Sequence, residues 1–310
     1  GGEWRSDLAT ERRLTTPRHY AYLKIGEGCD WKCGYCAIPL IRGPHVSVPM
    51  EQVLDEARRL AAGGVRELMV IAQDTTYYGV DLYGRRRLAD LLTELCRIGG
   101  IEWIRLHYAY PTGFPDDVIE VMAHEPKICK YLDIPFQHIS DAQLKAMKRR
   151  HTKADAYRLV ERLRAAVPDI ALRTTLLVGY PGETEADFRA TYELLEGLEP
   201  AYLHIFPFSE RPGTPAVDLP GKVQSSVATA RVAELEGLCD RLHGDFCVRA
   251  VGTEDTVLFE STRRGGMMFG FSGNYRRVKA PYDAAKVNTL CRVKLGAMDE
   301  SHDLMGDILD

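Results

Sequence analysis

The sequence has little that would place it in a membrane or on a nucleic acid. No apolar run approaches the roughly 20 residues that a helix needs to span a bilayer. The polar opening at residues 1–7 (GGEWRSD) lacks the charged and then apolar pattern of a signal peptide. The formal net charge is −4, so the chain as a whole is not drawn to nucleic acid by its charge. From these absences we expect no contact with a membrane and no export.

The composition is that of an ordinary folded protein. With 310 residues, 45% apolar and 27% charged, the chain is long enough for two domains or for one large α/β domain with an appendage. Five of its eight cysteines are scattered, mostly in apolar contexts, and we interpret them as inert buried thiols: Cys96, Cys129, Cys239, Cys247 and Cys291. Free thiols in a chain of this length predict a reducing, cytoplasmic location.

The other three cysteines lie within eight residues, in the spacing C-x3-C-x2-C. Cys29, Cys33 and Cys36 follow an apolar strand and can hold three corners of an iron–sulfur cluster, which normally takes four cysteine thiolates. The missing fourth ligand would leave one iron open to bind a small molecule. Two alternatives stay open: half of a disulfide framework, or three ligands of a structural zinc whose fourth ligand lies elsewhere.

Apolar strand patterns alternate with amphipathic helix patterns along most of the chain, which predicts parallel β/α units. We expect strands at 20–25, 67–73, 103–110, 131–137, 171–179 and 202–208, and helices at 50–62, 86–98, 115–124, 140–149, 153–167 and 183–197. Six units are too few for a closed eight-stranded barrel. We therefore expect an α/β fold with a partial, open, six-stranded β/α barrel.

The pattern changes near the C-terminus. A long amphipathic helix is expected at 222–249, followed by short strands separated by glycines, at 256–260, 267–271, 275–279 and 290–295. Short strands with glycine-rich turns predict a small all-β barrel. The expected organisation is an N-terminal linker at 1–17, a core domain at 18–245 that ends in the long helix, and a β-barrel domain at 246–310.

Polar residues gather where the expected strands end. They are the pairs Gln73-Asp74, Tyr110-Pro111 and Gln137-His138, and the turn at 179–183. Parallel α/β folds place their sites at the carboxyl ends of the strands. The sequence therefore predicts a pocket at this end of the sheet.

Several motifs together resemble those of the radical S-adenosylmethionine methylthiotransferase family. They are residues 24–43 (KIGEGCDWKCGYCAIPLIRG), 72–79 (AQDTTYYG), 131–138 (YLDIPFQH) and 173–184 (RTTLLVGYPGET), and the resemblance covers about residues 18–210. It implies a [4Fe-4S] cluster on Cys29, Cys33 and Cys36 whose open iron chelates S-adenosylmethionine. One electron then yields a 5′-deoxyadenosyl radical, with no catalytic residue beyond the cluster.

The resemblance and the residue chemistry suggest further site residues. For S-adenosylmethionine we expect Tyr35, Gln73, Asp74, Gln137, Arg173 and Gly179. Arg173 stands in an apolar strand and needs a partner, for which the methionine carboxylate is suited. For the substrate we expect Arg42, His138, Arg149, Arg150, Arg276 and Arg277. Simpler roles are open for several of them: a helix-dipole partner at 148–153, a positive φ at Gly179, and a solvated strand face at 274–279.

The family resemblance also implies a second, auxiliary cluster on three cysteines of a separate N-terminal domain, where one S-adenosylmethionine methylates a sulfur atom. No cysteine precedes Cys29, and the chain opens with Gly-Gly, which is typical of a cloning remnant. We therefore expect a fragment that binds one [4Fe-4S] cluster and cleaves S-adenosylmethionine, without completing methylthio transfer. The auxiliary cluster is expected in the full-length protein alone.

The substrate is indicated by two sets of motifs that disagree. Residues 73–75, 101–111 and 139–147 resemble the branch of the family that adds a methylthio group to the β-carbon of an aspartate in a small-subunit ribosomal protein. Residues 211–214, 257–260, 270–278 and 287–288 resemble the transfer-RNA branches, and the last three segments lie in a TRAM-like domain.

The charge of the C-terminal domain favours the ribosomal protein or the ribosome as partner. Residues 251–310 hold eight basic and nine acidic residues, a net charge of −1, whereas an RNA-binding domain should be basic. The alternatives are a transfer-RNA adenosine methylthiotransferase and, in another class, a module that only binds RNA or the ribosome. A flavodoxin or a ferredoxin is the expected reductant.

Overall fold

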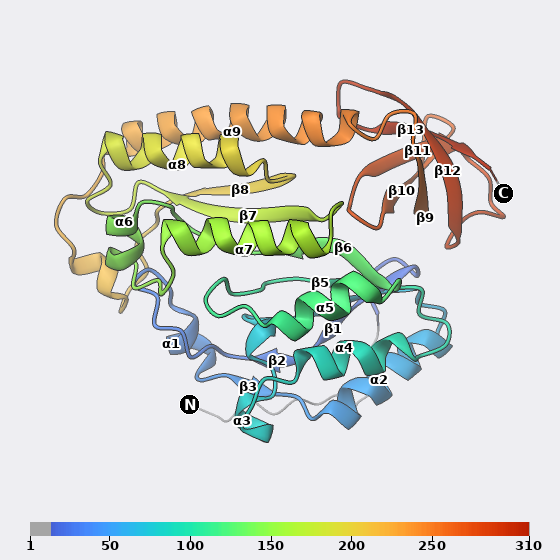
Figure 1. The fold of residues 1–310 in the computed structure, drawn as a ribbon, viewed down its shortest axis with the longest axis horizontal. Coiled ribbons are helices and arrows are strands. Elements are labelled where there is room, and N and C mark those ends of the chain that lie inside the picture. The colour runs from blue at the N-terminus through green and yellow to red at the C-terminus, as the bar shows by residue number, and fades with distance from the viewer. Residues whose placement is uncertain (1–13, 310) are drawn as a thin grey trace.

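The structure, a computed structural model, describes residues 14–309 (Figure 1). Most of the linker expected at 1–17 therefore lies outside the described residues. Within the described part, no helix is long and apolar enough to cross a bilayer.

Six parallel strands form one open sheet in which the spatial order follows the chain order, β1-β4-β5-β6-β7-β8. The strands are β1 (Tyr20–Lys24), β4 (Glu67–Ile71), β5 (Trp103–Leu106), β6 (Ile128–Asp133), β7 (Ala171–Val178) and β8 (Tyr202–Pro207). The expectation of an open, six-stranded β/α barrel is confirmed. β6 begins and ends earlier than expected. Its early end has a local cause, since Pro135 cannot donate a ladder hydrogen bond and Gln137 has a φ of 71°.

Helices cover the outer face of this sheet, as the sequence predicts (Figure 1). They are α2 (Met50–Ala62), α4 (Leu88–Cys96), α5 (Asp116–His124), α6 (Asp141–Ala146), α7 (Lys153–Ala166) and α8 (Glu185–Leu198). Both α7 and α8 begin with a capping box, formed by Thr152 with Asp155 and by Thr184 with Asp187. Short elements that the sequence did not indicate are β2 (Gly26–Glu27), α1 (Ile38–Arg42), β3 (Val46–Ser47), α3 (Val80–Tyr83) and 3₁₀ turns at Thr75–Tyr77 and Pro215–Asp218.

The long helix α9 (Ser225–Val248) runs along the core and leads to the C-terminal β-barrel (Figure 1). Five strands close this barrel in the order β10-β11-β13-β12-β9. They are β9 (Glu254–Arg264), β10 (Met267–Ser272), β11 (Arg277–Pro281), β12 (Leu290–Met298) and β13 (Leu304–Ile308). The small barrel is confirmed, but β13 was missed because its glycine interrupts the apolar alternation. That glycine, Gly306, is needed there, since a Cβ would lie 2.7 Å from Val278 Cγ1.

The turn between β10 and β11 packs against the sheet at the end where the parallel strands begin. Tyr275, with a φ of 71°, places its ring 3.8 Å from the guanidinium carbon of the fully buried Arg105. Arg105 also donates to Glu67 at 2.6 Å and to the carbonyls of Gly273 and Ser272 at 2.9 and 3.3 Å. The C-terminal β-barrel therefore packs against the end of the sheet at which the parallel strands begin.

Candidate functional site

The loop that carries the three cysteines is fixed at both ends and in the middle. Gly28 has a φ of 77°, and a Cβ there would lie 2.0 Å from the carbonyl oxygen of Pro44. The Cys29 amide donates to the Gly43 carbonyl at 3.1 Å. In the middle of the loop, the Gly34 amide donates to the carbonyl of Met147 at 2.9 Å, and its own carbonyl accepts from the Ala216 amide at 2.9 Å. The backbone thus holds the thiols without help from a ligand.

All eight cysteines are free, so they form no disulfide framework. Among residues 14–309, no three His, Cys, Asp or Glu side chains are arranged around one metal-ion position. Burial raises the pKa of the Cys29 thiol to about 12 and also raises the pKa of Cys36. Since metals bind the thiolate, cluster assembly must displace protons here.

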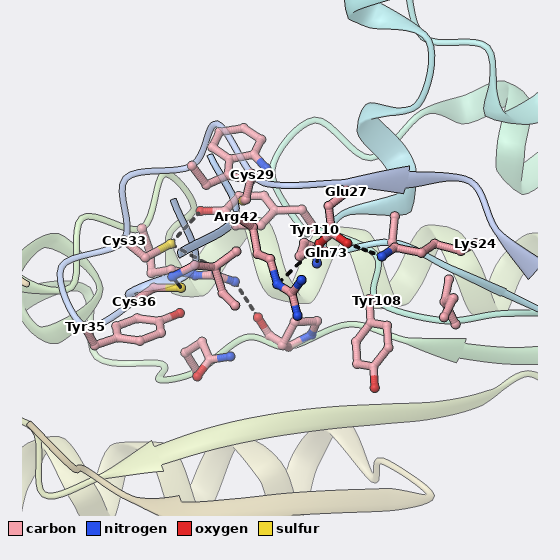
Figure 2. Close-up of a pocket in the computed structure, with 17 residues that line it drawn as sticks. Lys24, Glu27, Cys29, Cys33, Tyr35, Cys36, Arg42, Gln73, Tyr108 and Tyr110 are labelled. Atoms are coloured by element: carbon pink, nitrogen blue, oxygen red, sulfur yellow. Dashed lines mark hydrogen bonds and ion pairs between the residues drawn. The ribbon is translucent and has the colours of Figure 1, made fainter. Parts of the chain in front are cut away.

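A cavity of about 480 Å³ opens beside these thiols at the carboxyl ends of β1, β4 and β6, where the sequence predicted a pocket (Figure 2). Its walls are formed by Lys24, Glu27, Cys29, Trp31, Cys33, Tyr35, Cys36, Ile38, Arg42, Ile71, Ala72, Gln73, Tyr108, Tyr110, Pro135, Gln137 and Arg149. Seven of the residues predicted from the sequence are therefore brought together: the three cysteines and four others, Tyr35, Gln73, Gln137 and Arg42. Arg149 is an eighth and, like Arg42, was expected at the substrate.

One wall of the cavity presents a buried carboxylate and a free amide oxygen. Glu27 accepts hydrogen bonds from Lys24 and from Gln73 Nε2, the latter at 2.5 Å, and Arg42 Nε lies 3.9 Å away (Figure 2). Burial alone would raise the pKa of Glu27, but the Lys24 ammonium and the Gln73 amide outweigh it and lower that pKa. Gln73 Oε1 is buried without a hydrogen-bond partner. These acceptors suit an amine or a cationic ligand.

Another part of the cavity wall carries a permanent positive charge beside the cysteines. The buried Arg149 donates to Pro135 O, lies 3.6 Å from Cys33 Sγ and stands 4.2 Å above the Tyr110 ring. Its Nε is buried without a partner. Tyr110 stacks in turn on Trp31, with ring centroids 4.0 Å apart. A guanidinium in this place stabilises negative charge on the Cys33 sulfur.

Asp74 lies behind the cavity wall and positions the cysteine loop. It is buried and accepts from Trp31 Nε1 at 2.7 Å and from the Thr76 amide and hydroxyl at 2.9 and 2.7 Å. Arg150, expected at the substrate, stands 5.4 Å above the Trp31 ring. Asp74 therefore contacts the loop itself, and not the cavity that we expected it to line.

Two residues of the cavity wall adopt the left-handed backbone conformation that favours glycine. Tyr108 has a φ of 56° and Gln137 a φ of 71°. The Gln137 amide donates to Thr175 O at 2.8 Å, and its carbonyl accepts from the Leu177 amide at 2.8 Å. Backbone strain of this kind persists where the surroundings fix it, and it is concentrated at functional sites.

Besides Asp74 and Arg150, five predicted site residues do not line the cavity: His138, Arg173, Gly179, Arg276 and Arg277. The buried His138 ring accepts from the amides of residues 139 and 140 at 2.9 and 3.0 Å. Gly179 donates to Glu183, and a Cβ there would lie 2.8 Å from Ala228 in α9. Arg276 donates to the Phe246 carbonyl at 3.1 Å, and Arg277 lies 3.6 Å from Asp303. These contacts hold the fold together.

Arg173 belongs to a separate polar cluster inside the sheet, which we call the lumen cluster: His107, Tyr131, Asp133, Arg173 and His204. Its members come from β6, β7, β8 and the residue that follows β5. Asp133 and Arg173 are register partners on neighbouring strands, and Arg173 contacts the Tyr131 hydroxyl and the His204 ring. His107, Asp133 and His204 were not among the expected site residues. Their signal in the sequence is the same as that of Arg173, a polar residue in or next to an otherwise apolar strand.

Ionisation of Asp133 in the lumen cluster is expected to destabilise the folded state. Burial raises the pKa of Asp133 from 3.8 to about 6, against the lowering effect of Arg173. The folded state therefore loses stability as pH rises from about 3.8 to about 6, and the full loss is present above pH 6, whereas below pH 3.8 both states hold the proton. We expect Asp133→Asn to raise the free energy of unfolding by up to about 3 kcal/mol at pH 8 and to change it little at pH 4. Urea denaturation at both pH values measures this difference.

An exposed carboxylate provides the control for this comparison. Asp55 lies on the surface of α2, so Asp55→Asn should change the free energy of unfolding by less than about 0.5 kcal/mol at either pH. A stability gain of Asp133→Asn that is equal at pH 4 and pH 8 would contradict the argument from ionisation.

Comparison with known proteins places this site in a family. The model of the radical SAM superfamily matches residues 23–195, which include the three cysteines, the strands up to β7 and most of α8. The chain therefore belongs to the radical SAM superfamily, and a [4Fe-4S] cluster and S-adenosylmethionine are the cofactors of that superfamily.

Within the superfamily, the chain is similar to proteins named ribosomal protein uS12 methylthiotransferase RimO. It is 52% identical to the one from Flavobacterium johnsoniae, over 81% of this chain and 58% of the relative. It is 42% identical to the one from Phocaeicola vulgatus, over 100% of this chain and 73% of the relative. The chain spans 58% of the length of the Flavobacterium johnsoniae relative and 62% of the length of two other relatives of the same name.

Solved structures support the fold. A radical S-adenosylmethionine methyltransferase, TsrM from Kitasatospora setae, matches with a TM-score of 0.56 at 18% identity, over 84% of this chain and 46% of that one. Coproporphyrinogen III oxidase (HemN) from Escherichia coli matches with a TM-score of 0.54 at 15% identity, over 90% of this chain and 67% of that one. At these identities the likeness concerns the fold alone.

Proposed function

We propose that Cys29, Cys33 and Cys36 hold a [4Fe-4S] cluster and that the adjoining cavity binds S-adenosylmethionine. The observation that carries this proposal is the position of the thiols on one fixed loop at the wall of a cavity. At about 480 Å³ the cavity is within the size range of small-ligand sites. Three thiolates leave one iron of such a cluster without a protein ligand.

The residues of the cavity fit S-adenosylmethionine by charge. The Glu27 carboxylate and the partnerless Gln73 Oε1 can accept from its ammonium group and offset its sulfonium charge. Arg149 and Arg42 are the cations for its carboxylate. When bound, the cluster and S-adenosylmethionine supply radical chemistry, which the side chains of this chain do not provide. The contribution of the chain is to bind, to orient and to exclude water.

For the whole protein we propose a methylthiotransferase that modifies the β-carbon of an aspartate in ribosomal protein uS12. The names of relatives at 42–52% identity support uS12, and the lean of the core motifs toward the ribosomal-protein branch supports the aspartate. A second candidate is modification of a transfer-RNA adenosine, which the TRAM-like sequence of the β-barrel favours. A flavodoxin or a ferredoxin is the proposed reductant.

Anaerobic reconstitution tests the first step of this function. With iron, sulfide, S-adenosylmethionine and dithionite, we expect about four irons per chain and the release of 5′-deoxyadenosine, measured by mass spectrometry. A cluster without 5′-deoxyadenosine would indicate a binding module. About eight irons per chain would indicate that this chain holds the auxiliary cluster as well.

Binding across a range of salt concentrations separates the two substrates. We expect uS12 to bind the reconstituted chain more tightly than transfer RNA does at physiological salt. Transfer RNA, if it binds, should lose affinity steeply as salt rises, because phosphate contacts release counterions. Tighter binding of transfer RNA at physiological salt would favour the second candidate.

A further inference from the structure

The lumen cluster holds a cation whose side-chain contacts are to neutral groups. Arg173 Nη1 lies 3.5 Å from the Tyr131 hydroxyl, and Nη2 contacts the His204 ring. Within residues 14–309, Arg173 forms no ion pair with a carboxylate, although Asp133 is its register partner on the neighbouring strand. A planar guanidinium with free donors is suited to a carboxylate, which it binds with two parallel hydrogen bonds.

Three buried polar atoms of this cluster have no hydrogen-bond partner: Arg173 Nε, Asp133 Oδ1 and His107 Nε2. Asp133 and His107 are 3% and 8% exposed. Buried polar atoms almost always have a partner, because an unsatisfied one costs about 1–3 kcal/mol. This cluster has three such atoms, among them the Arg173 Nε donor and the Asp133 Oδ1 acceptor. They indicate that a polar group binds here during function.

The lumen cluster adjoins the cavity and can be reached from outside. Asp133 lies two residues before Pro135 of the cavity wall, about 7 Å along the chain at the rise of a β-strand. The half-exposed Tyr108 lines the cavity and lies close enough to influence Arg173 electrostatically. His204 is exposed on β8, at the open edge of the sheet. Tyr275 lies on the other side of the cluster, toward the end where the parallel strands begin, and contacts the Tyr131 ring. A side chain that enters past β8 would reach Arg173 on the neighbouring strand β7, close to the cavity.

We propose that the lumen cluster is the subsite for the carboxylate of the acidic side chain that is modified, with Arg173 as its anchor. This proposal rests on the proposed function, and it names the group that the substrate must carry. Tyr131 and the His107 ring lie beside Arg173 as neutral donors for the second carboxylate oxygen. An adenine base carries no carboxylate, so it would cover Arg173 without compensating its charge, which is costly.

The charges around Arg173 are consistent with this assignment. Burial, with the nearby cations Arg105 and Arg173, lowers the pKa of His107 to about 3, so its ring is neutral and can donate from Nε2. Burial raises the pKa of Asp133 to about 6, and a second carboxylate would raise it further. Asp133 can then take up a proton and donate to the incoming carboxylate, which removes the repulsion between the two acids.

A double-mutant cycle tests the anchor. The probe is uS12 encoded by the same genome, together with variants in which its aspartates are changed one at a time to asparagine. We expect one uS12 variant to bind the reconstituted chain about tenfold or more weakly, and Arg173→Gln to lose a similar factor with wild-type uS12. Combining the two changes should cost little more than either alone, because both remove the same contact. Arg162→Gln, an exposed arginine of α7, is the matched control and should bind like the wild type.

A second measurement separates the subsite from the choice of substrate. N-acetyl-aspartate N-methylamide should shift the ¹⁵N resonance of Arg173 Nε–H, whereas the asparagine analogue should not. If uS12 does not bind but this shift occurs, the proposed substrate fails and the carboxylate subsite stands. If uS12 binds while the losses from Arg173→Gln and the aspartate change add, or if the aspartate analogue gives no shift, the subsite is overturned and the proposed function stands.

Discussion

Cys33→Ala is expected to abolish cluster binding and, with it, the cleavage of S-adenosylmethionine. Cys33 is the buried member of the three, with Arg149 3.6 Å from its sulfur. A four-iron cluster that already lacks one cysteine ligand would keep only two, and two thiolates do not hold it. After anaerobic reconstitution, iron content should fall from about four per chain to below one, and 5′-deoxyadenosine should be undetectable.

Cys239→Ala is the matched control, because Cys239 lies in α9, away from the loop, and contacts the Leu203 carbonyl. It should keep the full iron content and the full yield of 5′-deoxyadenosine. If Cys33→Ala bound as much iron as Cys239→Ala, the assignment of the cluster to this loop would be wrong.

Arg105→Met is expected to destabilise the folded state strongly. It removes the cation that neutralises Glu67 and leaves the carbonyls of Ser272 and Gly273 without their donor. Breaking a buried ion pair by removing one partner costs about 3–5 kcal/mol, because the remaining charge is buried and uncompensated. Urea denaturation followed by circular dichroism should show a loss of that size in the free energy of unfolding.

Two further variants show whether this loss comes from the unpaired charge. Arg58→Ala breaks the exposed pair with Asp55 on α2 and should cost less than about 0.5 kcal/mol. The double variant Arg105→Met with Glu67→Gln should recover part of the stability, since no charge is left buried alone. A double variant as unstable as Arg105→Met would instead place the loss in the contacts to Ser272 and Gly273.

The elements of the core could be predicted because the signals for them are local. Each strand and helix has an apolar period that short segments reveal, and α2 was expected at the residues where it lies, 50–62. The end of β6 was wrong by four residues, because a proline and a left-handed glutamine break the strand although the sequence stays apolar. β13 was missed because its glycine is explained only by a neighbour across the barrel, Val278.

The residues of the candidate site also fall into those that are close together in the sequence and those that only the fold brings together. Cys29, Cys33, Cys36 and Tyr35 lie within eight residues, so a cluster site with an adjoining aromatic residue could be predicted from the sequence. Arg149 is 116 residues from Cys33, and the sequence offered no reason to bring them together. Asp74 was expected to contact a ligand, but it holds Trp31 from 43 residues away.

By itself, the sequence determined the cysteine spacing, the alternation of strands and helices and the small C-terminal β-barrel, because each depends on residues close together in the chain. The tertiary structure decided which distant side chains meet. It placed Arg149 beside Cys33 and packed Tyr275 on Arg105, at the end of the sheet where the strands begin. It also placed His107, Asp133 and Arg173 in one cluster on neighbouring strands. Such meetings depend on strand order and register, where a shift of one residue turns every side chain to the other face.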